Sequence, residues 1–470
     1  MRETHLLKRM AHALMSAQSR QCYDPYRPQW HLSPNVGLLN DPNGFIQHKG
    51  RYHLFYQWNP LACAHGAKFW GHWSSADLVN WRHEPVALIP AENYESHGCY
   101  SGSAVEDDDG TLTLVYTGNV KYDDGSRTAN QCLARENADG GFDKLGTVLP
   151  LPEGYTGHVR DPKVWRHDGK WYMVLGAQDT DLQGKVLLFS SDDLHQWQSL
   201  GEIAGSRLGG LGDFGYMWEC PDLFPLGQHD VLICSPQGLA AEEERYLNIF
   251  QAGYFVGKLD YDQGQFTHGD FQELDLGFEF YAPQTTTSQD GRRLMFGWMA
   301  VPDQDEFQQP TIEYGWVHTM TCPRELTLQD GMLYQQPARE LQSLRTQKHV
   351  WKGVADYAPI LPASSAELMV DTQGEFQINF ANLMVLCWDG ERLTLSRHNL
   401  RTGEPEHRYW RGELHRLHIL SDRSSVEIFI NHGAAVMSAR YFPLRDATVS
   451  FSGSGRLTLQ HWLLAPCVIE

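Results

Sequence analysis

A unit of about 60 residues recurs five times in this chain, and this repetition constrains the fold more than any other feature of the sequence. Each copy opens with a turn that contains a small residue, a polar residue or proline. It then continues as two short strands joined at Asp, Gly or His. The five copies are NDPNGFIQHKGRYHLFYQ from Asn40, SGSAVEDDDGTLTLVYTG from Ser101, RDPKVWRHDGKWYMVLGA from Arg160, ECPDLFPLGQHDVLICSP from Glu219 and YAPQTTTSQDGRRLMFGW from Tyr281.

The spacing of these copies is regular. Their equivalent positions lie 60, 60, 59 and 62 residues apart, at Pro42, Gly102, Pro162, Pro221 and Pro283. A second motif follows two of the copies, as DLVNW from Asp77 and DLHQW from Asp193. A β-sandwich requires no such equal intervals, whereas a β-propeller repeats one four-stranded sheet around an axis. The sequence therefore predicts a five-bladed β-propeller.

The propeller architecture has a consequence for the residues that open each repeat. The innermost strand of every blade lines the central channel. Residues at equivalent positions are therefore expected to meet around one axis, although they lie about 60 residues apart in the sequence. The opening residues include Asp41, Ser101, Asp161 and Glu219. Three carboxylates are thus predicted to converge on a single pocket.

The repeats end near residues 324–326, and the chain beyond is again rich in short strands, such as LMVLCWDG, RLTLSRH and SVEIFINHG. These favour a second domain built as a β-sandwich. Near the N-terminus, apolar residues at helical spacing indicate a surface helix that ends at about Gln18; they are Leu6, Leu7, Met10, Ala13 and Leu14.

We therefore expect an all-β protein with four segments. They are an N-terminal helical extension at 1–25, the propeller at 26–330, a linker at 331–349 with a short helix over 337–345, and a β-sandwich at 350–470.

The charge balance excludes some classes of partner. The chain has 58 Asp and Glu against 38 Lys and Arg, a formal net charge of −20. Nucleic acid and anionic membrane surfaces are therefore not expected to bind it. The first twenty residues have no continuous apolar segment, and no membrane span is predicted. Nine cysteines without zinc-site spacing indicate reduced thiols in a cytoplasmic protein.

Two of the predicted pocket carboxylates carry weak signals when taken alone. Asp41 lies in Asn-Asp-Pro-Asn-Gly, which is a good turn sequence in its own right. Aromatic residues such as Trp30 and Tyr52 flank it, and an aromatic pocket with a carboxylate is a common way to bind a sugar ring. Asp161 follows Arg160, and adjacent residues of a strand point to opposite faces, so these two are not expected to pair.

Glu219 lies among apolar neighbours in Tyr-Met-Trp-Glu-Cys-Pro-Asp. Desolvation is expected to raise its pKa, as a general acid near neutral pH requires. The structural alternative is a buried Glu neutralised by an Arg or a Tyr. The other two carboxylates favour the catalytic interpretation. The chain has no GxSxG, HExxH, GxGxxG or Walker motif, so other nucleophile schemes are weaker. A mechanism that uses carboxylates requires no metal or organic cofactor, and none is expected.

The acidic motifs together resemble those of glycoside hydrolase family 32. NDPNG, RDP and WECPD occur in the family's order, and YHLFYQ, SGSAV, SPQG, YAPQ and PREL extend the similarity from Tyr26 to the C-terminus. Members of that family have a five-bladed propeller followed by a β-sandwich. The resemblance implies that Asp41 is a nucleophile and Glu219 a general acid/base. It also implies that Asp161 binds fructosyl hydroxyls and stabilises the transition state.

The resemblance also implies a set of substrate-binding residues. They are Leu38, Leu39, Asn40, Gln57, Trp70, Tyr100, Ser101 and Arg160. Three departures from the family pattern concern substrate preference rather than reaction type. Leu38-Leu39 stands for an aromatic-Met pair, His65-Gly66 for a Trp-Gly pair and Tyr100 for a Phe.

The activity implied is retaining hydrolysis of the β-fructofuranosidic bond of a small-molecule substrate. For an unsecreted protein that substrate is sucrose 6-phosphate, which would give fructose and glucose 6-phosphate, with Lys68 a candidate phosphate contact. The alternative is an invertase acting on free sucrose or short fructo-oligosaccharides. Three further classes stay open: an arabinan- or xylan-cleaving propeller enzyme, a fructosyltransferase, and a non-catalytic carbohydrate-binding propeller. The sequence predicts no oligomeric state.

Overall fold

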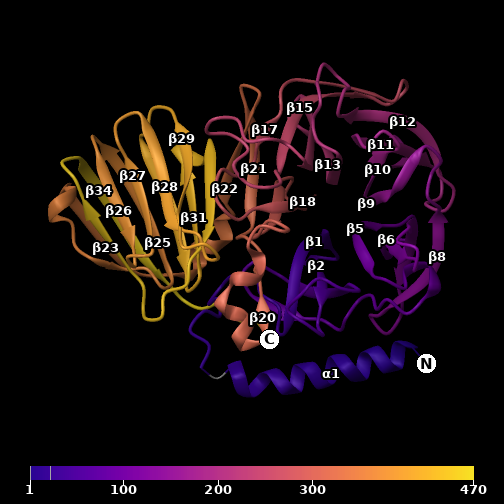
Figure 1. Ribbon diagram of the computed structural model, residues 1–470, viewed down its shortest axis with the longest axis horizontal. Helices are drawn as coiled ribbons and strands as arrows, with labels where there is room; N and C mark the ends of the chain where they lie inside the picture. The colour runs from indigo at the N-terminus through magenta and orange to yellow at the C-terminus, as the bar shows by residue number, and fades with distance from the viewer. Residues whose placement is uncertain (1, 22, 470) are drawn as a thin grey trace.

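The computed structural model describes residues 2–21 and 23–469, and strands dominate it (Figure 1). Residues 37–337 form five sheets that follow one another along the chain, one for each sequence repeat. The first sheet contains β1 (Gly37–His48), β2 (Arg51–Asn59), β3 (Phe69–Ser75) and β4 (Trp81–His83). The second contains β5 (Cys99–Glu106), β6 (Leu112–Lys121), β7 (Arg127–Glu136) and β8 (Phe142–Leu149). The third contains β9 (Tyr155–His167), β10 (Lys170–Asp179), β11 (Gly184–Ser191) and β12 (Gln198–Gly205).

The last two sheets of the series are built in the same way. Their strands are β13 (Met217–Leu226), β14 (His229–Gln237), β15 (Gly253–Asp260), β16 (Gln265–His268) and β17 (Gln272–Glu273), and then β18 (Tyr281–Thr287), β19 (Arg293–Trp298), β21 (Arg324–Gln329) and β22 (Met332–Pro337). The strands pair in antiparallel fashion in chain order within each sheet, except that β17 pairs with β15.

The five sheets close into a ring, and the predicted propeller is confirmed. The first strand of each sheet lies innermost (Figure 1). β1 contacts β5, β5 contacts β9, β9 contacts β13, β13 contacts β18, and β18 contacts β1. A further strand, β20 (Trp316–Val317), pairs in parallel with β1 and so ties the end of the repeat region to its start.

The C-terminal region is a β-sandwich of two six-stranded sheets, as expected. Val370, Ile378, Leu386 and Ile428 are among the apolar side chains that pack between the sheets. One sheet contains β23 (Arg345–Val354), β34 (Arg456–Leu464), β25 (Ala366–Gln373), β30 (Arg416–Asp422), β31 (Ser425–Ile430) and β32 (Ala435–Arg440); the other contains β24 (Leu361–Pro362), β33 (Thr448–Ser452), β26 (Phe376–Phe380), β27 (Met384–Trp388), β28 (Arg392–His398) and β29 (Pro405–Arg411).

The boundary between the two regions differs from the expected linker at 331–349. β22 pairs with β21 and is the outermost strand of the fifth propeller sheet, and β23 pairs with β34 inside the sandwich. Only residues 338–344 lie between these strands. The expected short helix is the 3-10 helix η4 (Arg339–Leu344). The other 3-10 helices are η1 (Asn93–Glu95), η2 (Glu306–Gln308), η3 (Pro310–Tyr314), η5 (Ala355–Tyr357) and η6 (Asn431–Gly433).

A fully buried ionic network joins the propeller to the sandwich. His31 contacts Oδ2 of Asp422 through Nδ1 at 3.0 Å and Oε1 of Glu427 through Nε2 at 2.8 Å. Arg324 contacts Oε2 of the same Glu427 at 2.8 Å and Oδ2 of Asp275 at 3.1 Å. All five side chains have no solvent exposure, so each charge depends on its partner across the interface.

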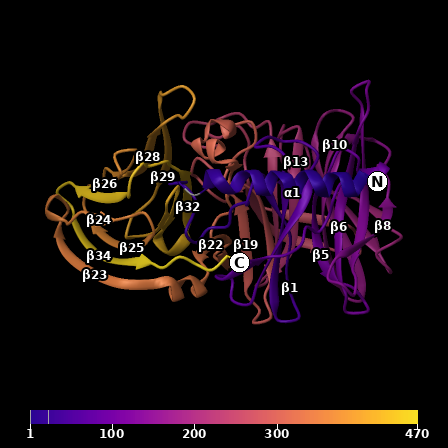
Figure 2. The ribbon, with the colours of Figure 1, turned by 90° about the horizontal axis from the view of Figure 1, so that it is seen from below.

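The helix α1 (Arg2–Gln21) lies along the outside of the propeller (Figures 1 and 2). The five apolar residues identified from their spacing pack against the propeller core, so the predicted surface helix is confirmed. It continues beyond Gln18 because no Gly or Pro interrupts residues 18–21. No helix in residues 2–21 and 23–469 combines the length and apolarity that a bilayer crossing needs.

Candidate active site

The inner strands share a backbone irregularity that shapes the centre of the propeller. Each carries one extra residue relative to its neighbour, a β-bulge, at the position that opens the sequence repeat. Three of the bulged residues adopt positive φ angles, namely Asp161 at 67°, Cys220 at 49° and Ala282 at 50°. A bulge bends the strand and redirects its side chains, and such conformations concentrate at functional sites. The bulges therefore bring the opening residues to the channel mouth.

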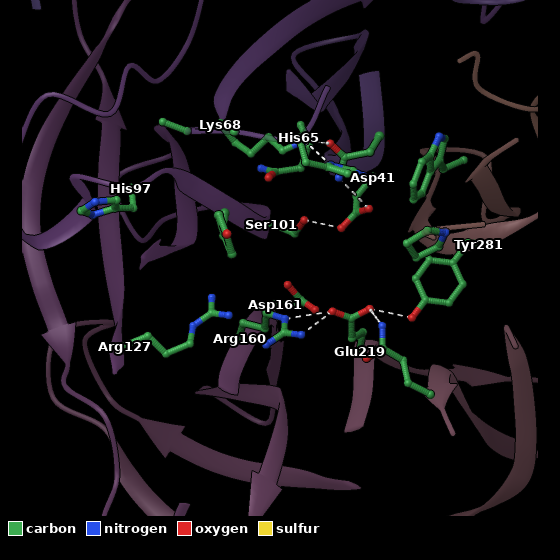
Figure 3. Close-up of a pocket in the computed structure, with 18 of the residues that line it drawn as sticks. Asp41, His65, Lys68, His97, Ser101, Arg127, Arg160, Asp161, Glu219 and Tyr281 are labelled. Carbon is green, nitrogen blue, oxygen red and sulfur yellow. Dashed lines mark hydrogen bonds and ion pairs between the residues drawn. The ribbon is translucent and has the colours of Figure 1, made fainter. Parts of the chain in front are cut away.

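A cavity of about 430 Å³ lies where the five inner strands begin (Figure 3). It is lined by Asn40, Asp41, Gln57, His65, Gly66, Ala67, Lys68, His97, Tyr100, Ser101, Lys121, Arg127, Arg160, Asp161, Glu219, Gln237, Tyr281, Trp298 and Pro302. The three carboxylates predicted to meet are all among them. Carboxylates that lie 58 to 178 positions apart in the sequence thus share one pocket.

Asp41 comes from β1 and is held by two donors. Ser101 Oγ donates to its Oδ2 at 2.5 Å, and Asn40 Nδ2 donates to its Oδ1 at 3.0 Å. Burial raises the pKa of Asp41, and the nearby charge of Glu219 acts in the same direction, whereas the two hydrogen bonds oppose the rise. The donors fix the orientation of the carboxylate toward the cavity (Figure 3).

Asp161 comes from β9 and lies at the floor of the cavity. Its backbone N–H donates to Thr117 Oγ1 at 3.1 Å, and its Oδ2 accepts from the Cys220 backbone N–H at 2.9 Å. Burial raises the pKa of Asp161 to about 7, and the charges of Glu219 and Asp41 add to the rise, although Arg160 opposes it. Asp161 therefore lies within electrostatic reach of both other carboxylates.

Glu219 comes from β13 and accepts hydrogen bonds on both oxygens. Arg160 donates to Oε1 from Nε at 2.9 Å and from Nη2 at 2.5 Å. Tyr281 OH donates to Oε2 at 2.6 Å, and Gln237 Nε2 donates to the same atom at 2.9 Å. As the strand geometry predicted, Arg160 does not pair with Asp161; it reaches across to the neighbouring blade.

These partners overturn the predicted direction of the Glu219 pKa. Burial alone would raise the pKa, as expected from the sequence, but the Arg160 charge and the hydrogen bonds from Tyr281 and Arg160 lower it below its ordinary value. Without ligand, Asp161 therefore binds a proton more readily than Glu219 does.

A second polar chain lies on the Asn40 side of the cavity. Lys68 Nζ donates to Asn40 Oδ1 at 2.7 Å and lies 2.7 Å from His65 Nδ1. The other nitrogen of His65 lies 3.0 Å from Oε2 of Glu306. Burial lowers the pKa of Lys68 to about 7, although the charges of Asp41 and Glu306 oppose this. His65 lines the cavity, whereas His72, seven positions further along the chain, is buried against Phe55.

Three expected substrate-binding residues lie outside this cavity lining. Leu38, Leu39 and Trp70 are fully buried. The Trp70 indole packs in the core and donates from Nε1 to the Tyr100 backbone carbonyl at 3.0 Å, so it supports the wall from behind. The predicted residues Asn40, Gln57, Tyr100, Ser101 and Arg160 do line the cavity.

The aromatic wall also differs from the one expected. Trp30 and Tyr52 are buried in apolar clusters rather than exposed to the cavity. The aromatic lining consists instead of Tyr100, Tyr281 and Trp298. Tyr281 opens the fifth repeat, and this position could have predicted that it lines the cavity.

Sequence reasoning missed three basic residues of one wall, Lys121, Arg127 and His97. They belong to the second repeat but lie at the distal ends of its strands and in the loop before β5, where the repeat alignment gives no signal. Together with Lys68 and Arg160 they surround the three carboxylates of the cavity with basic groups, in a chain whose net charge is −20.

Asp41, Asp161 and Cys220 place one ligand atom each within 4.8 Å of one another. Cys220 Sγ lies 3.6 Å from Oδ2 of both aspartates and donates its proton to them. Burial raises the pKa of this thiol well above its ordinary value. A cation at this point would have to displace that proton, and the contacts fit a thiol that bridges two carboxylates.

The central pocket of this propeller holds three carboxylates between an aromatic wall and several basic groups. Such a site defines a glycoside hydrolase. The model of the glycosyl hydrolases family 32 N-terminal domain matches residues 31–337, and that of the family 32 C-terminal domain matches residues 364–462. The chain belongs to glycosyl hydrolase family 32.

Individual relatives agree with this assignment. The sucrose-6-phosphate hydrolase of Klebsiella pneumoniae is 59% identical over 460 residues, which cover 97% of each chain. That of Bacillus subtilis is 49% identical and covers 94% of this chain and 95% of its own. Among solved structures, the sucrose-6-phosphate hydrolase of Lactobacillus gasseri superposes with a TM-score of 0.89 at 31% identity, covering 97% of this chain and 96% of that one. A β-fructofuranosidase of Bombyx mori gives 0.87 at 35% identity, covering 98% of each chain.

Proposed function

We propose that this protein is a retaining β-fructofuranosidase that hydrolyses sucrose 6-phosphate to fructose and glucose 6-phosphate. The observation that carries the proposal is the convergence of Asp41, Asp161 and Glu219 on one aromatic and basic pocket. Relatives that match almost the whole chain are sucrose-6-phosphate hydrolases. Free sucrose is the second candidate substrate, because the Bombyx mori relative is a β-fructofuranosidase. We also propose a cytoplasmic location, where a phosphorylated sugar would be met.

In the first step, the Asp41 carboxylate attacks the anomeric carbon of the fructosyl unit. Glu219 donates a proton to the bridging oxygen, so the glucosyl unit leaves as an alcohol. The negative charges of Asp41 and Asp161 stabilise the positive charge that develops on the fructosyl ring. Ser101 and Asn40 hold Asp41 in the attacking orientation.

This step requires a proton on Glu219 and a charged Asp41. Without ligand the pKa of Glu219 is lowered and those of the two aspartates are raised, which favours the reverse arrangement. Substrate supplies the change, because fructosyl hydroxyls that donate to Asp41 and Asp161 lower the pKa of both carboxyls. The same hydroxyls fill the cavity and exclude water, which increases the pKa of Glu219. The proton count of the cluster stays constant, and only its position moves.

In the second step, Glu219 takes a proton from water, which attacks the fructosyl-enzyme and releases fructose. Tyr281 and Gln237 hold Glu219 Oε2 and Arg160 holds Oε1, so these contacts orient the carboxyl in both steps. Retention of configuration follows from two successive inversions at the anomeric carbon.

Substitution of Glu219 by Gln tests the proposal. The variant should lose nearly all activity on sucrose 6-phosphate, because glucose 6-phosphate leaves poorly without protonation. A fructosyl donor with a leaving group of low pKa should still react in the first step, so the fructosyl-enzyme should accumulate. Azide, which needs no deprotonation, should then restore part of the turnover. Glu153→Gln, a change at an exposed position, is the matched control.

Equal loss on both donors without azide rescue would assign the acid to another group. Release of fructose onto a second sugar rather than onto water would indicate a transferase. Absence of any sugar release by the unmodified protein would favour a carbohydrate-binding propeller.

A further inference from the structure

Lys121 and Arg127 form an unusual pair in the second propeller blade. They lie directly opposite each other at the end of the β6–β7 ladder, and both line the cavity. Like charges on directly opposed residues of an antiparallel pair destabilise a sheet. No carboxylate among the described residues forms an ion pair with either of them. Such a pair is tolerated where an anion compensates the charge.

The contacts of Arg127 leave its charge unneutralised. Its Nη2 donates to Asn119 Oδ1 at 2.5 Å, and its Nη1 lies 3.3 Å from His158 Nδ1; both partners are neutral acceptors. Its Nε is buried and has no hydrogen-bond partner in the described chain. A buried donor without a partner is costly, so the described protein groups alone do not satisfy this guanidinium.

Lys121 and His97 offer further donors beside Arg127. The Lys121 side chain is exposed, and its ammonium makes no hydrogen bond with a described residue. The Lys121 backbone N–H donates to His97 Nδ1 at 3.2 Å, so Nδ1 is an acceptor and the proton of the neutral ring lies on Nε2. His97 therefore presents an N–H donor. The hairpin acid Asp124 accepts from Ser126 within its own turn and does not line the cavity.

The position of Arg127 identifies which half of the substrate it would meet. His158 Nδ1 lies 2.9 Å from Arg160 Nη1 and 3.3 Å from Arg127 Nη1, so the two guanidinium groups are neighbours. Arg160 in turn holds Glu219, the proposed proton donor to the leaving group. Lys68, by contrast, contacts Asn40 beside the proposed nucleophile. Figure 3 shows Arg127 and Arg160 on one side of the cavity and Lys68 on another.

We propose that Arg127, Lys121 and His97 bind the phosphate of a phosphorylated leaving group, the 6-phosphate of the glucosyl unit. A phosphate dianion supplies the acceptors that the three donors lack, and a planar guanidinium matches its oxygens. This assignment replaces Lys68 as the expected phosphate contact. It rests on the proposed β-fructofuranosidase activity and adds the residues that discriminate sucrose 6-phosphate from sucrose.

The test compares kcat/KM for sucrose 6-phosphate with kcat/KM for sucrose in the full-length protein. Arg127→Gln should lower the ratio of the two values by roughly 10- to 100-fold, since hydrogen bonds between charged groups contribute that much. Lys121→Gln should lower it by about tenfold for the same reason. The control is Lys170→Gln, which removes a cation that pairs with Asp192 on the surface and should leave the ratio unchanged.

Inhibition provides a second measurement that does not require turnover of the phosphorylated substrate. Glucose 6-phosphate should inhibit sucrose hydrolysis more strongly than glucose in the unmodified protein, and Arg127→Gln should remove that difference. Direct binding of the two sugars, followed by calorimetry, gives the same comparison without catalysis.

Several outcomes would overturn the proposal. An equal fall in kcat/KM for both substrates would show that Arg127 acts only by positioning Arg160. A ratio near one in the unmodified protein would refute a phosphate site while leaving a β-fructofuranosidase. Release of fructose from neither substrate would instead refute the proposed function, and the calorimetric comparison of glucose 6-phosphate with glucose would then decide the phosphate site alone.

Discussion

The guanidinium of Arg160 donates two hydrogen bonds to a single oxygen of Glu219, at 2.9 and 2.5 Å. The two residues open consecutive blades, 59 positions apart. Their contact lowers the pKa of Glu219 against the effect of burial, while Asp161, the immediate neighbour of Arg160, has a pKa raised to about 7. The two shifts are opposite in direction, although both carboxyls are buried in the same cavity.

Replacement of Arg160 by Gln should shift the alkaline limb of the pH profile of kcat/KM. Loss of the cation raises the pKa of Glu219, because a nearby opposite charge typically changes a carboxyl pKa by about 1–3 units. The acid form of Glu219 then survives to higher pH, so the limb moves upward by about one unit or more. An Arg166→Gln variant, altered at an exposed pair with Asp108, is the control. An unmoved limb would contradict the role of Glu219 as the acid.

Replacement of Asp41 by Asn should lower kcat by at least about three orders of magnitude, because an amide is a poor nucleophile. The fold should persist, since the Asn carbonyl can still accept the Ser101 hydroxyl. Circular dichroism melting and single-turnover kinetics measure the two effects separately. Asp168→Asn, a change at an exposed turn, should leave kcat unaffected. Near-normal turnover of the Asp41 variant would exclude it as nucleophile.

Replacement of Ser101 by Ala removes the 2.5 Å donor to Asp41. That hydrogen bond lowers the pKa of Asp41, so its loss leaves burial less opposed and raises the pKa further. The charged nucleophile then forms only at higher pH, and the acidic limb of kcat/KM should move upward with roughly a tenfold loss at the optimum. Ser101→Thr keeps the hydroxyl and should restore the limb. A limb that stays in place in the Ala variant would show that Ser101 does not tune the nucleophile.

Replacement of Arg324 by Leu should destabilise the protein by about 3–5 kcal/mol at pH 7, because Glu427 and Asp275 would remain buried without their cation. The pKa of Glu427 is lowered to about 2, with burial opposing and Arg324 and His31 causing the decrease. The stability that Glu427 contributes is therefore complete above the unfolded pKa near 4.5 and is lost as the pH falls toward 2. The difference in the free energy of unfolding between the Arg324→Leu variant and the unmodified protein should therefore become smaller below pH 4.

Urea unfolding at pH 7 and pH 3 measures this deficit. Arg416→Leu removes a partly exposed pair with Asp371 and should cost less than about 1 kcal/mol at either pH. A deficit of the same size for both variants would show that the buried network does not hold the two regions together.

Much of the architecture could be read from the sequence because strand periodicity and turn residues are local signals. Five repeats spaced about 60 residues apart predicted the ring, and the equivalent positions of Asp41, Asp161 and Glu219 predicted their meeting. The alternation of a strand also predicted that Arg160 would not pair with its neighbour. The sandwich followed from the same kind of strand and turn pattern.

Other features depended on distances between blades, which no local pattern carries. The pKa of Glu219 is lowered rather than raised because Arg160 and Tyr281 approach it from the preceding and following blades. Leu38, Leu39 and Trp70 are buried, and Trp70 lies on β3, two strands away from the inner strand β1.

Lys121, Arg127 and His97 form one wall of the cavity because a hairpin and a loop of the second blade reach the cavity rim. Sequence alone thus determined which strands exist and which residues open them. The tertiary structure decided which charges neutralise one another, because Coulomb interactions and hydrogen bonds depend on separations of a few ångströms that are fixed only when the ring closes.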